Sequence, residues 1–218
     1  MCYHGEPIPA DVQNCYDLIM DVVEEDGPFD AVLGFSQGSA IGATVMLTEA
    51  AKNNGKQPFK MGVFLSTTMP FDFGSGVLQL KYDRRDGLSA MHYDADLRTP
   101  TAKSEDVDWR TDCRSKGVID EFEARHPCVQ DSESVEVDVL LRYHPTTHSQ
   151  RLRVPTVHVI GRKDDYAEHG KNLYGMCDPR YATVVTHDGG HQLPRDVNTV
   201  AKVADSIIRA VELMRYQS

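Results

Sequence analysis

Helical and strand-like spacings of apolar residues alternate along this chain. Apolar residues recur every three or four positions over Pro9–Glu25 and again over Asn198–Met214, which predicts two amphipathic helices. A third helical spacing is formed by Ala40, Ala43, Leu47 and Ala50. Short segments rich in apolar residues predict buried strands at 31–33, Met61–Ser66, Val154–Ile160 and Ala182–His187. Because strands alternate with helices, we expect an α/β fold with a mostly parallel sheet covered on both faces.

The first and last predicted helices each carry an apolar stripe. In the first helix the stripe comprises Val12, Cys15, Tyr16, Ile19, Val22 and Val23. In the last helix it comprises Val200, Val203, Ala204, Ile207, Ile208 and Val211. We expect these two stripes to be the buried faces of their helices.

Residues 71–150 differ from the rest of the chain, because they are rich in charge and no apolar period persists there. Val135, Val137, Val139 and Leu141 alternate like a strand, but a helix fits this segment equally well. We expect one domain over residues 1–218, with 71–150 as an insertion. Over the active-site edge of a sheet it would form a lid, and the alternative is a solvated insertion that touches no substrate.

Composition narrows the class of protein. With 218 residues, 40% hydrophobic and 26% charged, the chain resembles a soluble globular protein. Its net charge of −10 would repel a phosphate backbone, so we expect no nucleic-acid partner. No apolar run approaches membrane-spanning length, so we expect no membrane partner and a cytoplasmic location. The five cysteines include no Cys-x-x-Cys pair, and Cys15 is expected in the core.

The sequence Gly34-Phe35-Ser36-Gln37-Gly38 lies between a predicted strand and a predicted helix. A bare Gly-x-Ser-x-Gly occurs by chance in about one chain of this length in fifteen, so its context matters. Here the context is that of a nucleophile elbow, which lifts the serine above the carboxyl edge of a sheet. We expect the turn to require glycine at both Gly34 and Gly38. The alternative is a tight glycine turn with a bystander serine.

A serine nucleophile needs a base, and the base needs an orienting carboxylate. In this architecture they follow the serine in the order carboxylate, then histidine. His191 is the predicted base, since Gly189 and Gly190 allow an unusual backbone path that turns its imidazole toward the elbow. His187, at the end of the preceding strand, is the second candidate, and His158 is predicted to be a hydrogen-bonded core residue.

Asp164 is the predicted carboxylate, because it is the third residue after Gly161 and can turn back over the sheet. Asp165 competes with it directly, and an ordinary acidic turn is the alternative for both. His144 and His148 have metal-clamping spacing, but Pro145 follows the first and no third ligand is evident. We therefore expect no metal site.

Three segments together resemble the fungal "family of serine hydrolases": residues 27–40, residues 155–164 and residues 189–194. The resemblance implies a small α/β-hydrolase without a cofactor, and some members of this family are thioesterases that release polyketides from their synthases. By position it makes Ser36 the nucleophile, Asp164 the orienting carboxylate and His191 the base. It also makes the Gln37 N–H one of two oxyanion donors.

One feature departs from the family. Its members begin with an apolar strand and a Leu-His-Gly-like loop that supplies the other oxyanion donor, whereas only a helix precedes the elbow here. We therefore expect an N-terminally shortened α/β-hydrolase-like fold. Loss of one oxyanion donor costs about 10²–10³ in turnover. Loss of the first strands leaves the elbow strand with an open edge, through which we expect self-association.

The hypothesis from the sequence is a serine hydrolase that cleaves an ester or thioester of an acyl chain. The acyl substrate is a small molecule or is bound to a carrier, and the resemblance extends this to a polyketide-type product of secondary metabolism. Two alternatives stay open: a truncated, catalytically impaired pseudo-enzyme that binds a partner, and a carboxylesterase for small esters.

Overall fold

The structure is a computed structural model, and it describes residues 8–83, 87–93 and 134–217. The chain divides into two compact units. The parallel unit comprises Cys15–Pro70 and Tyr143–Ser218, and the antiparallel unit comprises Met1–Asn14 and Phe71–Arg142. The predicted site residues, from Ser36 to His191, all belong to the parallel unit.

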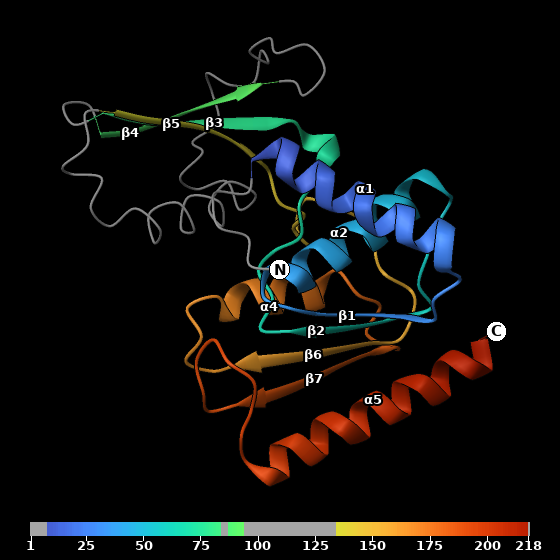
Figure 1. The fold of residues 1–218 in the computed structure, drawn as a ribbon. Coiled ribbons are helices and arrows are strands. Elements are labelled where there is room, and N and C mark those ends of the chain that lie inside the picture. The colour runs from blue at the N-terminus through green and yellow to red at the C-terminus, as the bar shows by residue number, and fades with distance from the viewer. Residues whose placement is uncertain (1–7, 84–86, 94–133, 218) are drawn as a thin grey trace. The chain divides into compact units, whose positions relative to one another are not determined.

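Four parallel strands form the sheet of the parallel unit, in the order β1-β2-β6-β7 (Figure 1). They are β1 (Ala31–Phe35), β2 (Met61–Leu65), β6 (Thr156–Gly161) and β7 (Ala182–His187). The second and third strands are inside the sheet, and every residue of β6 is buried. The expectation that β7 is buried was wrong, because β7 is last in the strand order and Thr183, Val184 and Thr186 are exposed. The α/β fold class expected from the sequence is confirmed.

Helices cover both faces of this sheet. They are α2 (Gln37–Lys52), α4 (Ala167–Gly175) and α5 (Val197–Gln217), each of which contacts strands of the sheet. Helix α1 (Pro9–Asp26) precedes β1, and its Tyr16 hydroxyl donates to the Glu49 carboxylate of α2. Successive side chains of a strand point to opposite faces. On one face, Val63 and Val157 pack with Ala210 of α5. On the other, α2 packs on β1 and β2, and Gly62 leaves room for the ring of Phe64, because a Cβ atom there would lie 2.6 Å from that ring.

Strand β1 is an edge strand, and the expectation that it is buried was wrong. Leu33 is 64% exposed and Phe35 is 42% exposed. Among the described strands, β1 pairs only with β2. Leu33 is in register with Val63 and so shares the face that α5 covers, but α5 packs mainly on β2, β6 and β7. The apolar run is therefore read correctly as a strand and wrongly as a central one.

The helical stripes are only partly buried. The face of α5 that packs on the sheet comprises Ile207, Ala210, Val211 and Met214. Val200, Ala204 and Ile208 were expected to be buried and are exposed. In α1, Val22 is exposed and Cys15 is half-buried rather than in the core. Each helix lies against its neighbours along one narrow strip, so the outer part of each stripe faces solvent.

The antiparallel unit contains a three-stranded sheet in the order β4-β3-β5. Its strands are β3 (Val77–Asp83), β4 (Gly87–Tyr93) and β5 (Ser134–Leu140), and a short 3₁₀ helix, η1 (Phe73–Ser75), precedes them. The alternating segment that began at Val135 is thus a strand, and β3 and β4 were not predicted. A lid over the active site stays a prediction, and residues 94–133 lie outside the described part of the chain.

Candidate active site

Ser36 occupies a strained turn between β1 and α2. Its φ is 55° and its ψ is −121°, in a region that residues with a side chain rarely adopt. The Ser36 N–H donates to the carbonyl of Leu65 at 2.9 Å, so the end of β2 holds the turn. The hydroxyl therefore stands just past the carboxyl end of β1, at the first turn of α2.

The two glycines of the motif are needed to different degrees. A Cβ atom on Gly34 would lie 2.4 Å from the amide nitrogen of Ser39, so no side chain fits there. A Cβ atom on Gly38 would meet nothing within 4 Å. The expectation that both positions must lack a side chain is therefore right at Gly34 and wrong at Gly38, because Gly38 faces open space among the described residues.

Ser39 is a further anchor of the elbow, and sequence reasoning did not identify it. Its side chain is fully buried. The Ser39 hydroxyl accepts from the Leu65 N–H at 3.0 Å and lies 3.3 Å from the Leu65 carbonyl. A small polar residue at the start of an otherwise apolar helix is the only signal for this role that the sequence offers.

The structure brings together the three residues predicted for catalysis. Nε2 of His191 lies 2.8 Å from the Ser36 hydroxyl oxygen. Nδ1 of His191 lies 3.0 and 3.1 Å from the two carboxylate oxygens of Asp164. The side chain of Asp164 is 2% exposed, and the Tyr166 N–H donates to its Oδ1 at 2.9 Å. One imidazole thus connects a buried carboxylate to a hydroxyl at the surface.

The competing residues lie elsewhere. Asp165 is exposed, and Asp164 is the carboxylate that meets the imidazole. His187 is buried, and its Nδ1 accepts from the Gly189 N–H at 3.1 Å, so it supports the histidine loop instead of facing Ser36. His158 is a buried core residue as expected, with Nε2 3.1 Å from the hydroxyl oxygen of Thr156.

His158 also lies 3.5 Å from the sulfur of Cys177, so the two could be mistaken for a nucleophilic cysteine–histidine pair. Burial lowers the pKa of His158 to about 3. Burial likewise raises the pKa of the Cys177 thiol to about 12. Both side chains are therefore neutral at pH 7, and the thiol is not activated for attack.

The loops that carry Asp164 and His191 interlock. Gly189 and Gly190 do not have the left-handed φ that would mark an unusual backbone path, so that expectation was wrong. Gly189 is needed for space, because a Cβ atom on it would lie 2.8 Å from Nδ1 of His187, whereas a Cβ atom on Gly190 would lie 3.3 Å from the Lys163 carbonyl oxygen. A Cβ atom on Gly161 would lie 2.3 Å from the Gly190 carbonyl oxygen, so glycine is required there, which the sequence patterns did not predict. The close approach holds base and carboxylate in register.

Gln37, the predicted oxyanion donor, is the first residue of α2. Backbone N–H groups in the first turn of a helix have no acceptor within that helix, and they carry partial positive charge. The Gln37 N–H is therefore suited to an oxyanion next to Ser36. Its role stays a prediction, and residues 1–7 lie outside the described part of the chain.

Within residues 8–83, 87–93 and 134–217, no cluster of three or more His, Cys, Asp or Glu side chains could hold a metal ion. The His144 N–H donates to Nδ1 of His148 at 3.1 Å, so the contact between these two histidines stabilises the turn that contains them. No helix in the same ranges is both long and apolar enough to span a bilayer.

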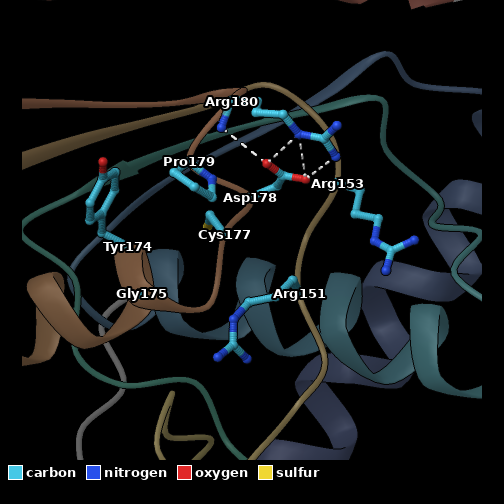
Figure 2. Close-up of a pocket in the computed structure, with 8 residues that line it drawn as sticks. All are labelled: Arg151, Arg153, Tyr174, Gly175, Cys177, Asp178, Pro179 and Arg180. Carbon is cyan, nitrogen blue, oxygen red and sulfur yellow. Dashed lines mark hydrogen bonds and ion pairs between the residues drawn. The ribbon is translucent and has the colours of Figure 1, made fainter.

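A hollow of about 500 Å³ is lined by residues that precede β6 and β7, at the end of these strands away from the triad. Figure 2 shows the residues that line it. Its lining includes three arginines, Arg151, Arg153 and Arg180. Arg180 is paired with Asp178, and Arg151 donates to the backbone carbonyls of neighbouring residues. Figure 2 shows Arg151 and Arg153 extending in different directions. The guanidinium groups thus do not converge on one ligand position.

Known proteins are similar to this chain over most of its length. The family described as "Serine hydrolase (FSH1)" matches residues 7–203. Hydrolase FUB4 of Fusarium oxysporum f. sp. lycopersici is 32% identical over 210 residues, which cover 96% of this chain and 76% of that protein. Esterase alnB of Emericella nidulans is 31% identical, over 92% of this chain and 73% of that protein.

Solved esterase structures are more distant. An arylesterase structure has a TM-score of 0.42 and 16% identity, covering 95% of this chain and 60% of that one. The carboxylesterase EstE1 has a TM-score of 0.42 and 14% identity, covering 95% of this chain and 63% of that one. The chain thus spans less than two thirds of the length of these esterases, and the family assignment depends on the sequence comparisons.

Proposed function

Because this chain belongs to the FSH1 serine hydrolase family, we propose that it cleaves an ester or thioester of an acyl chain by way of an acyl-enzyme on Ser36. The observation that supports this most directly is the continuous contact from Ser36 through His191 to Asp164. Nucleophile, base and orienting carboxylate are the three roles that such chemistry requires.

In the first half of the reaction, the Ser36 oxygen attacks the carbonyl carbon of the substrate while Nε2 of His191 takes its proton. The buried carboxylate of Asp164 holds Nδ1 and stabilises the imidazolium that forms. Negative charge on the former carbonyl oxygen would be stabilised by the Gln37 N–H. The intermediate then collapses, and His191 returns the proton to the departing alcohol or thiol.

In the second half, water attacks the acyl-enzyme, with His191 again as the base. The acid leaves, and the proton returns to the Ser36 oxygen. Water is the one reactant besides the substrate, and His191 gives up in each half of the reaction the proton that it has taken.

The identity of the acyl chain is the finer part of the proposal. The resemblance of the three motif segments to the family supports release of a polyketide-type chain from its synthase as the reaction. Hydrolysis rates for a p-nitrophenyl ester of butyrate and for the matching N-acetylcysteamine thioester would separate a small-ester esterase from a thioesterase. A thioesterase should prefer the thioester, and an esterase the ester.

The deciding experiment is labelling of the purified chain with a fluorophosphonate probe, beside its Ser36→Ala variant. We expect the parent chain to be labelled and the variant not to be. Circular dichroism would establish that both are folded. Absence of labelling in a folded parent would contradict the proposal and favour a catalytically impaired remnant that binds a partner.

A further inference from the structure

Two aromatic rings contact the imidazole of His191. The ring centroid of Phe35 lies 5.3 Å from that of His191, with the planes at 50°. Tyr166 belongs to another element, and its ring centroid also lies 5.3 Å from that of His191, in an edge-on contact with the planes at 70°. These separations are those of favourable aromatic pairs. Neither residue belongs to the triad, and the sequence motifs do not explain either ring.

Each ring is also tied to a different member of the triad. Phe35 is the last residue of β1 and directly precedes Ser36. Tyr166 caps the amino end of α4, and its N–H donates to Oδ1 of Asp164 at 2.9 Å. A shift of either backbone would therefore move a ring and a reacting group together.

We propose that Phe35 and Tyr166 are positioning residues, whose rings hold the His191 imidazole in the orientation that bridges Ser36 and Asp164. This inference rests on the proposed function. The side chain of His191 is one-third exposed and is carried by a loop with two consecutive glycines. The interlocked loops hold the backbone next to His191, and the two rings contact the imidazole itself.

The same rings also suit the charge that His191 acquires. When Nε2 takes the proton of Ser36, the imidazole becomes a cation, and aromatic faces attract cations. The contribution therefore falls on turnover rather than on binding of the substrate.

The test compares Phe35→Leu and Tyr166→Leu with the conservative variant Tyr166→Phe, using p-nitrophenyl butyrate as substrate. Leucine keeps an apolar side chain, and Tyr166→Leu keeps the N–H to Asp164. We expect each leucine variant to lose about tenfold in kcat with KM within about twofold of the parent. We expect Tyr166→Phe to retain the parent kcat within about twofold. Phe29→Leu, at a phenylalanine of similar exposure outside the site, is the matched control.

A second readout separates positioning from a general loss of structure. The ring protons of His191, assigned with a His191→Gln variant, are expected to shift in the NMR spectra of both leucine variants while the melting temperature stays close to the parent value. Parent-like kcat in both leucine variants would overturn the inference. So would a rise in KM alone, which would make the rings part of the substrate surface.

The outcomes for the two proposals are distinguishable. If the parent is not labelled by the fluorophosphonate, the proposed function fails, and the NMR comparison still decides whether the rings hold the imidazole. If the parent is labelled and the leucine variants match it in kcat, only the positioning role fails. Because Phe35 is partly exposed, Phe35→Leu is expected to fold even if Tyr166→Leu does not.

Discussion

Asp164 and Asp165 are neighbours in sequence with opposite surroundings, and this makes a matched pair of variants. Asp164→Asn keeps an oxygen for the Tyr166 N–H, so the fold should be retained. The amide no longer favours the tautomer of His191 that can accept a proton at Nε2, so we expect kcat to fall by about three to four orders of magnitude. Ester hydrolysis and circular dichroism would measure the two effects.

Asp165→Asn is the control, because that carboxylate is exposed and the contact to His191 belongs to its neighbour. We expect its kcat to stay within about twofold of the parent, in line with the small effects of most surface changes. A severe loss in Asp165→Asn with little change in Asp164→Asn would reverse the assignment of the carboxylate.

His158 gives a prediction about pH and stability. Burial lowers its pKa from 6.5 to about 3, so the unfolded chain takes up a proton below pH 6.5 that the folded chain does not. The folded state therefore loses about 1.4 kcal/mol for each pH unit below 6.5 through this residue. We expect the stability difference between the parent and His158→Gln to shift in favour of the variant between pH 7.5 and 5, measured by urea unfolding. The same pH dependence of the unfolding free energy in the parent and in His158→Gln would contradict this prediction.

At the scale of elements, the junction between β1 and α2 contains one glycine that cannot change and one that can. Gly34→Ala would push a Cβ atom against the Ser39 backbone, and we expect it to cost about 3 kcal/mol. Gly38 is the second residue of α2 and faces open space, so Gly38→Ala should be neutral or stabilise by up to about 1 kcal/mol. Equilibrium unfolding in urea measures both, and equal losses would contradict the geometry.

In the parallel unit, local sequence patterns predict an element correctly where one continuous segment of the chain forms one buried element. The run from Val154 to Ile160 overlaps β6, and the motif around Ser36 lies at a strand–helix turn as expected. Strands β3 and β5 pair with each other although the fifty residues 84–133 lie between them in the sequence, so no local period shows their pairing. For the same reason Leu33 looked buried, since a run of apolar residues does not say which strands flank it.

Some residues of the candidate site can likewise be predicted from local sequence, and others depend on contacts between distant segments. Ser36, Asp164 and His191 follow strand ends, and strand ends can be found from sequence. Ser39 and Gly161 depend on how closely β2 and the histidine loop approach them in space. Phe35 and Tyr166 meet His191 from two elements that are far apart in the chain, so their contact emerges only from the assembled structure.

At the scale of the molecule, the edge strand β1 and the net charge act in opposite directions on self-association. An apolar edge strand with open backbone groups favours pairing with a second chain. The net charge of −10 repels that chain, and salt screens the repulsion. If the edge drives association, the apparent mass in light scattering should rise between about 20 and 300 mM salt, where the screening length falls below 10 Å.

A lysine at position 33 tests whether β1 is the surface involved. Leu33 is the most exposed apolar residue of that strand, and a lysine on an edge strand disfavours pairing with another strand. We expect Leu33→Lys to stay monomeric at both salt concentrations. Leu18→Lys changes the net charge equally at a half-exposed leucine of α1, so it should associate like the parent. Equal loss of association in both variants would mean that charge, rather than the open edge, controls assembly.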